Sequence, residues 1–170
     1  MNETERRAWL RLALTPGVGP ATARALLGTF GLPDAVFAAS STRLAAVVGD
    51  ALARTLAGPA APEQAQAIEA TLAWLERDDT YHLLTLADDA YPRGLLAMAD
   101  PPPLLYAIGR IDLLAQPALA IVGSRSATQQ GAATAESFAA GLARAGYGVV
   151  PYLLSKLAAE SKECRAIVFC

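Results

Sequence analysis

The first eighty residues show apolar positions with the period of an α-helix, interrupted by turns rich in glycine and proline. Asn2 and Glu5 have the spacing of a capping box in front of a helix that we expect to end near Leu14. The stretch Thr15-Pro16-Gly17-Val18-Gly19 stops this helix, because proline cannot continue a helix and glycine permits positive φ. Pro20 then suits the first turn of the next helix, so the pattern predicts helix, glycine turn, helix.

The same pattern returns thirty residues further along the chain. Eight residues are identical at this offset, which is more than an alanine-rich composition readily gives. The matching pairs are Leu14/Leu44, Val18/Val48, Gly19/Gly49, Ala21/Ala51, Ala23/Ala53, Arg24/Arg54, Leu26/Leu56 and Gly28/Gly58. The repeat therefore predicts tandem helix-hairpin-helix units of the SAM-like type, with residues 33–40 as a connecting helix.

Two interpretations of the glycine turns stay open. The turn of such a hairpin can present backbone N–H groups to a DNA phosphate, aided by the partial positive charge at the next helix N-terminus. Alternatively, the glycines only permit close packing of the hairpins. The second copy, Val47-Val48-Gly49-Asp50, has one glycine fewer and places a carboxylate where a phosphate would lie, which favours the packing interpretation.

A closing helix and several short strands follow. Residues 63–77 have an amphipathic pattern with Ile68, Leu72 and Leu75 on one stripe. Apolar runs of strand length then occupy residues 81–86, 104–108, 118–122 and 147–150, and residues 132–145 form a helical run. We predict an α + α/β fold class, with a helical domain over residues 1–78, the start of an incomplete Rossmann-like domain over residues 79–150, and a tail over residues 151–170.

The loop after the strand at 118–122 carries the candidate chemistry. It reads Gly123-Ser124-Arg125-Ser126-Ala127-Thr128 and leads into the helical run. In an open α/β sheet, ligands bind at the carboxyl ends of the strands. Free N–H groups at a helix start, hydroxyl groups and a guanidinium together suit a phosphate, so we predict a phosphate site at Gly123, Ser124, Arg125 and Ser126. The alternative is that these residues only satisfy their own backbone.

The loop lacks the sequence patterns of common nucleotide-binding sites, which limits the kinds of phosphate ligand that we expect it to bind. Neither G-x-G-x-x-G nor the Walker pattern is present, and the strand at 147–150 runs into Pro151 rather than into an acidic residue that would hold a ribose. Arg125 therefore suits a phosphodiester better than a dinucleotide or a nucleoside triphosphate. No cofactor is implied, and two Cys and one His cannot fill a four-ligand zinc site without carboxylates.

Other polar and aromatic residues receive ordinary roles. Ser124 is not expected to be catalytic, because Gly-Ser-Arg-Ser is not a nucleophile elbow and His82, the single histidine, lies far away in sequence. We expect a turn at Asp88-Asp89 and a core position for Trp74. Cys164 and Cys170 are expected to be reduced thiols.

Several motifs with a distinctive spacing remain. They are Tyr91-Pro92, Asp100-Pro101-Pro102, Leu105-Tyr106 with Gly109, and above all residues 120–128 followed by Gly131. Residues 1–150 with these motifs resemble the DNA-processing protein A (DprA/Smf) family. The resemblance implies a non-enzymatic, homodimeric Rossmann-type protein whose Gly-Ser-Arg loop contacts single-stranded DNA, and which shields incoming strands and loads the RecA recombinase during natural transformation. Carried over, Gly123, Ser124, Arg125 and Ser126 become the DNA-phosphate site.

The composition changes abruptly after Val150. Residues 1–150 contain all 13 glycines and neither lysine nor cysteine, whereas residues 151–170 contain both lysines, both cysteines and no glycine. The family continues at this point with a glycine-rich stretch ending in Gly-Ile-Asp, which this chain lacks. We therefore expect residues 151–170 to be an unrelated tail after a truncation or frameshift, with the rest of the sheet and the self-association surface missing. An ordinary C-terminal helix over residues 153–166 is the alternative.

Charge and hydropathy limit the classes of protein to which this chain can belong. With 54% hydrophobic residues the chain has ample material for a globular core, and a net charge of −2 argues against nucleic-acid contact over the whole surface. The start does not resemble a secretory signal, and no apolar run reaches the roughly 18 residues of a membrane span, so we expect a cytoplasmic protein. Single-stranded-DNA binding is the leading prediction. A Rossmann-like nucleotide-binding enzyme and a non-functional remnant are the alternatives.

Overall fold

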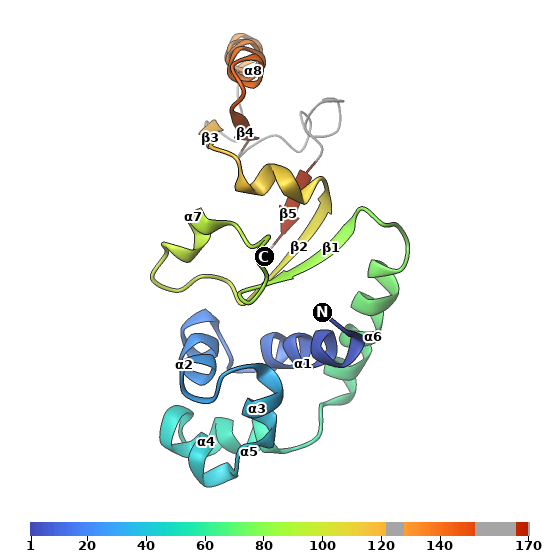
Figure 1. Cartoon of the computed structure of the whole chain (residues 1–170), viewed down its shortest axis with the longest axis vertical. Coiled ribbons are helices and arrows are strands. Elements are labelled where there is room, and N and C mark those ends of the chain that lie inside the picture. Colours follow the sequence, from blue (N-terminus) through green and yellow to red (C-terminus); the bar gives the residue numbers. More distant parts are fainter. Residues whose placement is uncertain (122–127, 152–165, 170) are drawn as a thin grey trace. The chain divides into compact units, whose positions relative to one another are not determined.

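The computed structural model describes residues 1–121, 128–151 and 166–169, and the chain divides into two compact units. One unit consists of Met1–Ala107 together with Val168–Cys170, and the other of Ile108–Ile167. The helices and strands of both units are labelled in Figure 1.

Six helices open the first unit. They are α1 (Glu3–Leu14), α2 (Pro20–Phe30), α3 (Pro33–Ala38), α4 (Ser41–Val48), α5 (Asp50–Ala57) and α6 (Pro62–Leu75). The capping box is confirmed, because the Asn2 side chain accepts from the Glu5 N–H and the Glu5 carboxylate accepts from the Asn2 N–H, both at 2.9 Å. Pro20, Pro33 and Pro62 begin three of the helices, where a missing N–H leaves no helical hydrogen bond unmade.

The predicted tandem hairpins are present and share one apolar core. Its buried members, each at most 1% exposed, are Leu12, Leu26, Val36, Leu44, Ala53 and Leu56. Gly17 and Gly49 occupy corresponding turns with φ of +89° and +80°, a backbone conformation that favours glycine. A Cβ added to Gly17 would lie 3.4 Å from the Leu52 side chain of α5, so the first turn packs against the second hairpin.

Helices α1 and α6 also pack against the first strands of a sheet (Figure 1). Strands β1 (Tyr81–Thr85) and β2 (Leu104–Gly109) are neighbours, β5 (Ala166–Phe169) lies beside β2, and the short helix α7 (Arg93–Leu96) lies between β1 and β2 in sequence. The core between helices and strands contains Trp9, Leu10, Ile68, Leu72, Leu83 and Leu104. The first compact unit therefore continues past residue 78, and the domain boundary expected there stays a prediction.

Trp74 lies half-buried beside this core. Its ring stacks on Tyr81 with 4.7 Å between centroids and meets Tyr106 edge-on at 5.8 Å. The aromatic cluster joins the end of α6 to both strands, in keeping with the packing role expected for Trp74.

The second unit contains one strand-helix-strand arrangement. Its elements are a 3-10 helix (Ile111–Ala115), β3 (Ala118–Ile121), α8 (Gln129–Arg144) and β4 (Gly148–Pro151). Half-buried positions on α8 recur with helical spacing at Ala132, Ala135, Ala139 and Leu142, whereas Phe138 is 66% exposed. With a helical first part and a small strand-containing region, the predicted α + α/β fold class is confirmed.

Part of the expected tail is described. Residues 166–169 form β5, and most of the alternative helix over residues 153–166 lies outside the described residues. None of the helices in the described part of the chain is long and apolar enough to cross a membrane.

Candidate nucleic-acid interface

Strands β3 and β4 run parallel, and α8 connects them. The paired residues include Ala118 with Gly148 and Ile121 with Pro151. Parallel neighbours require a crossover connection, and a helix is the usual one. The carboxyl end of β3 and the start of α8 therefore bracket residues 122–127, which is the position of a ligand-binding loop in open α/β sheets.

Thr128 fixes the start of α8. Its Oγ1 accepts a hydrogen bond from the Gly131 N–H at 3.1 Å, which satisfies one of the N–H groups that have no partner within a helix. A Cβ on Gly131 would lie 3.2 Å from the same oxygen, so glycine keeps this cap uncrowded. The hydroxyl oxygen of Thr128 thus serves the helix itself, which its sequence position in the loop did not indicate, while its O–H remains a donor.

The four predicted site residues, Gly123, Ser124, Arg125 and Ser126, lie outside the described residues. Their assignment as a phosphate site stays a prediction. The structure supplies the elements on either side of them, with β3 ending at Ile121 and α8 capped at Thr128.

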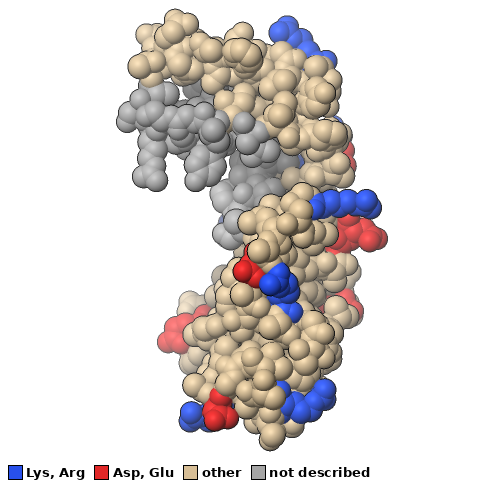
Figure 2. All heavy atoms as spheres, turned by 90° about the vertical axis from the view of Figure 1, so that its left-hand side faces the viewer, with Lys and Arg blue, Asp and Glu red and all other residues tan. Residues whose placement is uncertain are grey.

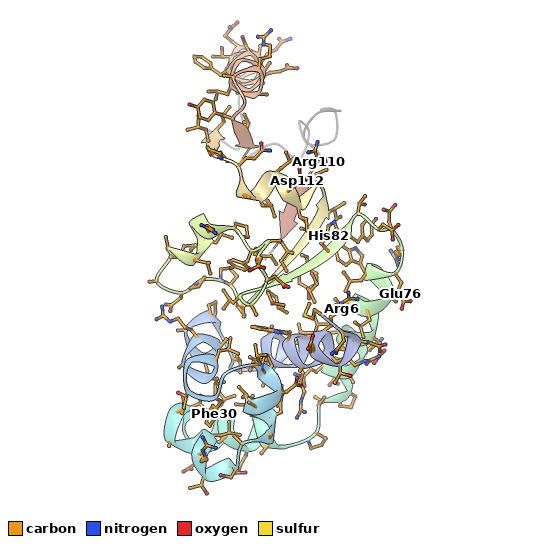
Figure 3. All side chains as sticks on the ribbon, in the orientation of Figure 1. Arg6, Phe30, Glu76, His82, Arg110 and Asp112 are labelled. Carbon is orange, nitrogen blue, oxygen red and sulfur yellow. The ribbon has the colours of Figure 1, made fainter. Side chains whose placement is uncertain are left out.

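Charges on the described surface are sparse, and three of its arginines, Arg7, Arg24 and Arg110, form ion pairs. On the face in Figure 2, blue and red side chains are scattered over a mostly tan surface, and the described residues form no continuous basic patch there. In the second unit, Arg110 donates to both carboxylate oxygens of Asp112, at 3.2 and 2.5 Å (Figure 3). These hydrogen bonds lower the pKa of Asp112 and raise that of Arg110, so this arginine is already compensated.

Two family models match the chain. Residues 82–153 match "DNA recombination-mediator protein A", and residues 10–57 match the "SAM-like Helix-hairpin-helix tandem". The chain is 43% identical to the DNA processing protein DprA of Streptococcus pneumoniae over 58 residues, which are 34% of this chain and 21% of that protein. It is 26% identical to protein Smf of Synechocystis over 168 residues, which take in 95% of this chain and 41% of that protein.

Residues 82–153 match the recombination-mediator model, and the chain is similar in sequence to DprA and Smf proteins. Its fold is similar to that of the X-ray structure of DNA processing protein A from Streptococcus pneumoniae, with a TM-score of 0.59 at 19% identity, over 99% of this chain and 68% of that chain. The chain spans less than half the length of the Synechocystis relative. The match therefore does not show that this chain has the activity of the longer protein.

Two of the DprA/Smf motifs have structural roles that the sequence did not reveal. The Tyr91 hydroxyl donates to the Pro102 carbonyl at 2.7 Å, which closes the segment between β1 and β2. Asp100 forms an ion pair with Arg24 of α2 at 3.0 Å, which ties this segment to the helices. The expected turn is present, because the Asp88 carboxylate accepts from the N–H and hydroxyl of Thr85 at 2.7 and 2.8 Å.

The turns of the helical hairpins have features of both interpretations. Gly17 and Gly19 are exposed, and α2 begins without a side-chain cap, as a phosphate contact requires. Asp50, however, occupies the first turn of α5 in the second hairpin. The nearby cation Arg24 is paired with Asp100, which leaves the packing role as the one with direct contacts.

Proposed function

We propose that this chain binds single-stranded DNA through the loop Gly123-Ser124-Arg125-Ser126. The observation that supports the proposal is the parallel β3–α8–β4 arrangement, which brackets this loop between a strand end and a capped helix start. The match of residues 82–153 to the recombination-mediator model spans the same elements.

The chemistry of the loop suits a phosphodiester backbone. A guanidinium forms charge-assisted hydrogen bonds with phosphate oxygens, and the first N–H groups of α8 carry partial positive charge toward the loop. Because the chain carries a net charge of −2, the contact is local and depends on Arg125 rather than on a broad basic surface.

In the wider proposal, the protein acts in the cytoplasm as a binding protein and not as an enzyme. It shields incoming single strands during natural transformation and loads RecA on them, as a homodimer. This part rests on the similarity to DprA and Smf proteins and on the match of residues 82–153 to the model of a DNA recombination mediator.

Arg125→Ala, made in the full chain, tests the DNA site. We expect weaker binding of a fluorescent single-stranded oligonucleotide and a salt dependence whose slope, in log Kd against log salt, falls by about 0.7 for one lost phosphate contact. Arg144→Ala is the matched control, since Arg144 lies in the last turn of the same helix α8. Equal affinity and equal slope for wild type and Arg125→Ala would refute the proposal.

Separate assays address the wider proposal. Oligonucleotide coated with a single-strand-binding protein is offered to RecA with and without this chain, and faster RecA filament formation is the expected result. Turnover of any member of a nucleotide panel that depends on Arg125 would instead favour the enzyme alternative. Absence of both strand binding and turnover, in a chain whose helices remain folded, would favour a non-functional remnant.

A further inference from the structure

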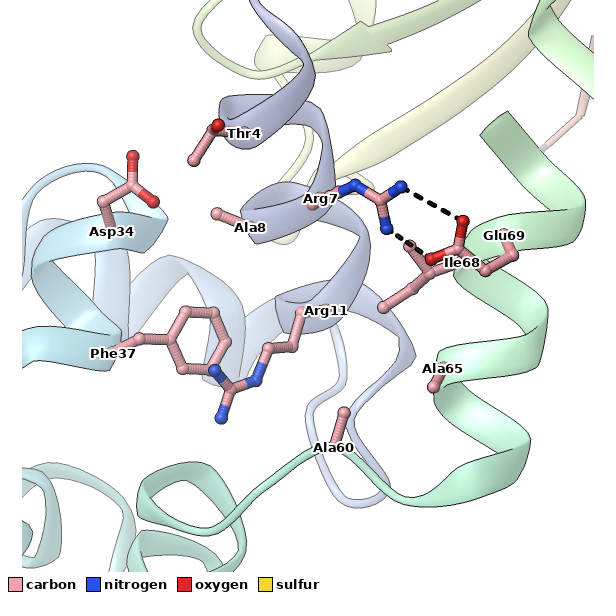
Figure 4. A pocket seen from close by; sticks show the side chains of 10 residues that line it. All are labelled: Thr4, Arg7, Ala8, Arg11, Asp34, Phe37, Ala60, Ala65, Ile68 and Glu69. Carbon is pink, nitrogen blue, oxygen red and sulfur yellow. Dashed lines mark hydrogen bonds and ion pairs between the residues drawn. The ribbon is translucent and has the colours of Figure 1, made fainter. Parts of the chain in front are cut away.

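A groove of about 360 Å³ lies between α1, α3 and α6 within the first compact unit (Figure 4). Ala8 and Ile68 line it and are 9% and 6% exposed, and Phe37 adds a half-buried ring. Ala60 and Ala65 line the side of the groove next to α6, and their small side chains leave it open. The floor of the groove is therefore apolar and lies at the molecular surface.

Four charged residues line the groove, but only one carboxylate is unengaged. Arg7 donates to both oxygens of Glu69, and its Nε donates to Glu3 at 2.9 Å. Arg11 donates through Nη2 to two backbone carbonyls and lies over the Phe37 ring. Asp34 is exposed and has no hydrogen bond or ion pair among the described residues.

An apolar floor with one available carboxylate is complementary to an aliphatic chain that ends in a cation. An anion would meet Asp34 and Glu69, while Arg7 is paired with Glu69 and Glu3 and the Nη2 of Arg11 donates to two backbone carbonyls. A second guanidinium would compete with Arg11 for the Phe37 ring, which lies 4.0 Å from the Arg11 guanidinium carbon. An ammonium on a flexible four-carbon stem fits these conditions better.

We propose that the groove between α1, α3 and α6 binds a lysine side chain of a partner protein. Its stem lies over Ala8, Phe37 and Ile68, and its ammonium pairs with Asp34. The groove uses residues of the first unit alone, so the proposal is independent of the DNA site.

NMR titration of the full chain with Nα-acetyl-lysine methylamide tests this proposal. We expect saturable shifts of the Ala8 and Ile68 methyl groups, and little response to the same probe with its Nε acetylated. Asp34→Asn should weaken binding about three-fold, the size of an exposed ion pair. Asp50→Asn is the matched control, because Asp50 also lies in the first turn of its helix but outside the groove.

A second pair of variants tests the groove itself. Ala65→Leu fills it from α6, whereas Ala70→Leu places the same side chain on an exposed position of α6 that does not line it. Loss of the methyl shifts in Ala65→Leu alone is the expected result. Equal shifts with the acetylated probe, or unchanged shifts in Ala65→Leu, would overturn the proposal.

Discussion

Arg11 of α1 lies over the ring of Phe37 of α3, with 4.0 Å between its guanidinium carbon and the ring centroid. The same guanidinium donates to the carbonyl of Gly58 at 2.7 Å and to that of Leu56 at 3.2 Å. One side chain thus joins the first helix to the connecting helix and to the linker in front of α6.

Arg11→Met should destabilise the helical hairpins markedly. The methionine keeps the apolar stem but leaves two carbonyls without their charged donor, which costs about 1.5–3 kcal/mol. Urea unfolding followed by circular dichroism measures the change in the free energy of unfolding. Arg6→Met on the same helix is the control, because Arg6 has no side-chain hydrogen bond among the described residues, and equal losses in both variants would contradict the role of Arg11.

The contrast between local and distant contacts explains how much of the fold the sequence could predict. The capping box at Asn2 and the turn at Gly17 depend on neighbouring residues, so residue type and spacing indicated both. Arg11 and Gly58 are 47 residues apart, and no local pattern connects them. The Arg24–Asp100 ion pair also joins residues far apart in the chain, so it could not be predicted from the sequence either.

The Arg7–Glu69 ion pair predicts a pH dependence of stability. The hydrogen bond from Arg7 lowers the pKa of Glu69 below its ordinary value, so the folded state holds this proton less tightly than the unfolded state. Its contribution is therefore present at neutral pH and is lost as the pH falls from the ordinary range of glutamate through the lowered pKa of Glu69.

Arg7→Gln removes this contribution. The difference in urea midpoint between wild type and variant should be largest near neutral pH and should shrink in acid, and added salt should reduce it because both side chains are exposed. Arg6→Gln should show no such trend. A difference that grows in acid would mean that the ion pair does not account for the effect of Arg7.

Gly49 and Gly28 should respond to alanine in opposite directions. Gly49 has φ of +80° and ψ of 163°, a region that is nearly restricted to glycine, so Gly49→Ala should cost about 2 kcal/mol although the space around it is open. Gly28 lies inside α2 with open space around it, and Gly28→Ala should stabilise by up to about 1 kcal/mol. Thermal unfolding of both variants would show the contrast, and two shifts of the same sign would contradict it.

At the candidate site, the order of the elements could be predicted from the sequence, but the roles of the individual polar residues could not. The order strand, polar loop, helix could be predicted, because β3 is an apolar run and α8 has helical periodicity. Which polar groups serve the fold and which remain for a ligand depends on hydrogen bonds. Thr128 illustrates this, since it belongs to the same polar run as Ser124 and Ser126 but caps α8.

Three substitutions at Thr128 separate its role as a cap from a role in DNA binding. Thr128→Ala removes the acceptor for the Gly131 N–H and should cost about 1 kcal/mol of α8 stability, seen as faster hydrogen exchange at Gly131. Thr128→Ser should restore protection. Thr128→Asp also keeps an acceptor but adds a negative charge next to the proposed phosphate site, so it should retain protection at Gly131 and lose affinity for single-stranded oligonucleotide. Full affinity in Thr128→Asp would mean that the DNA phosphate binds away from the start of α8. Unchanged hydrogen exchange at Gly131 in Thr128→Ala would mean that the Thr128 side chain does not stabilise the start of this helix.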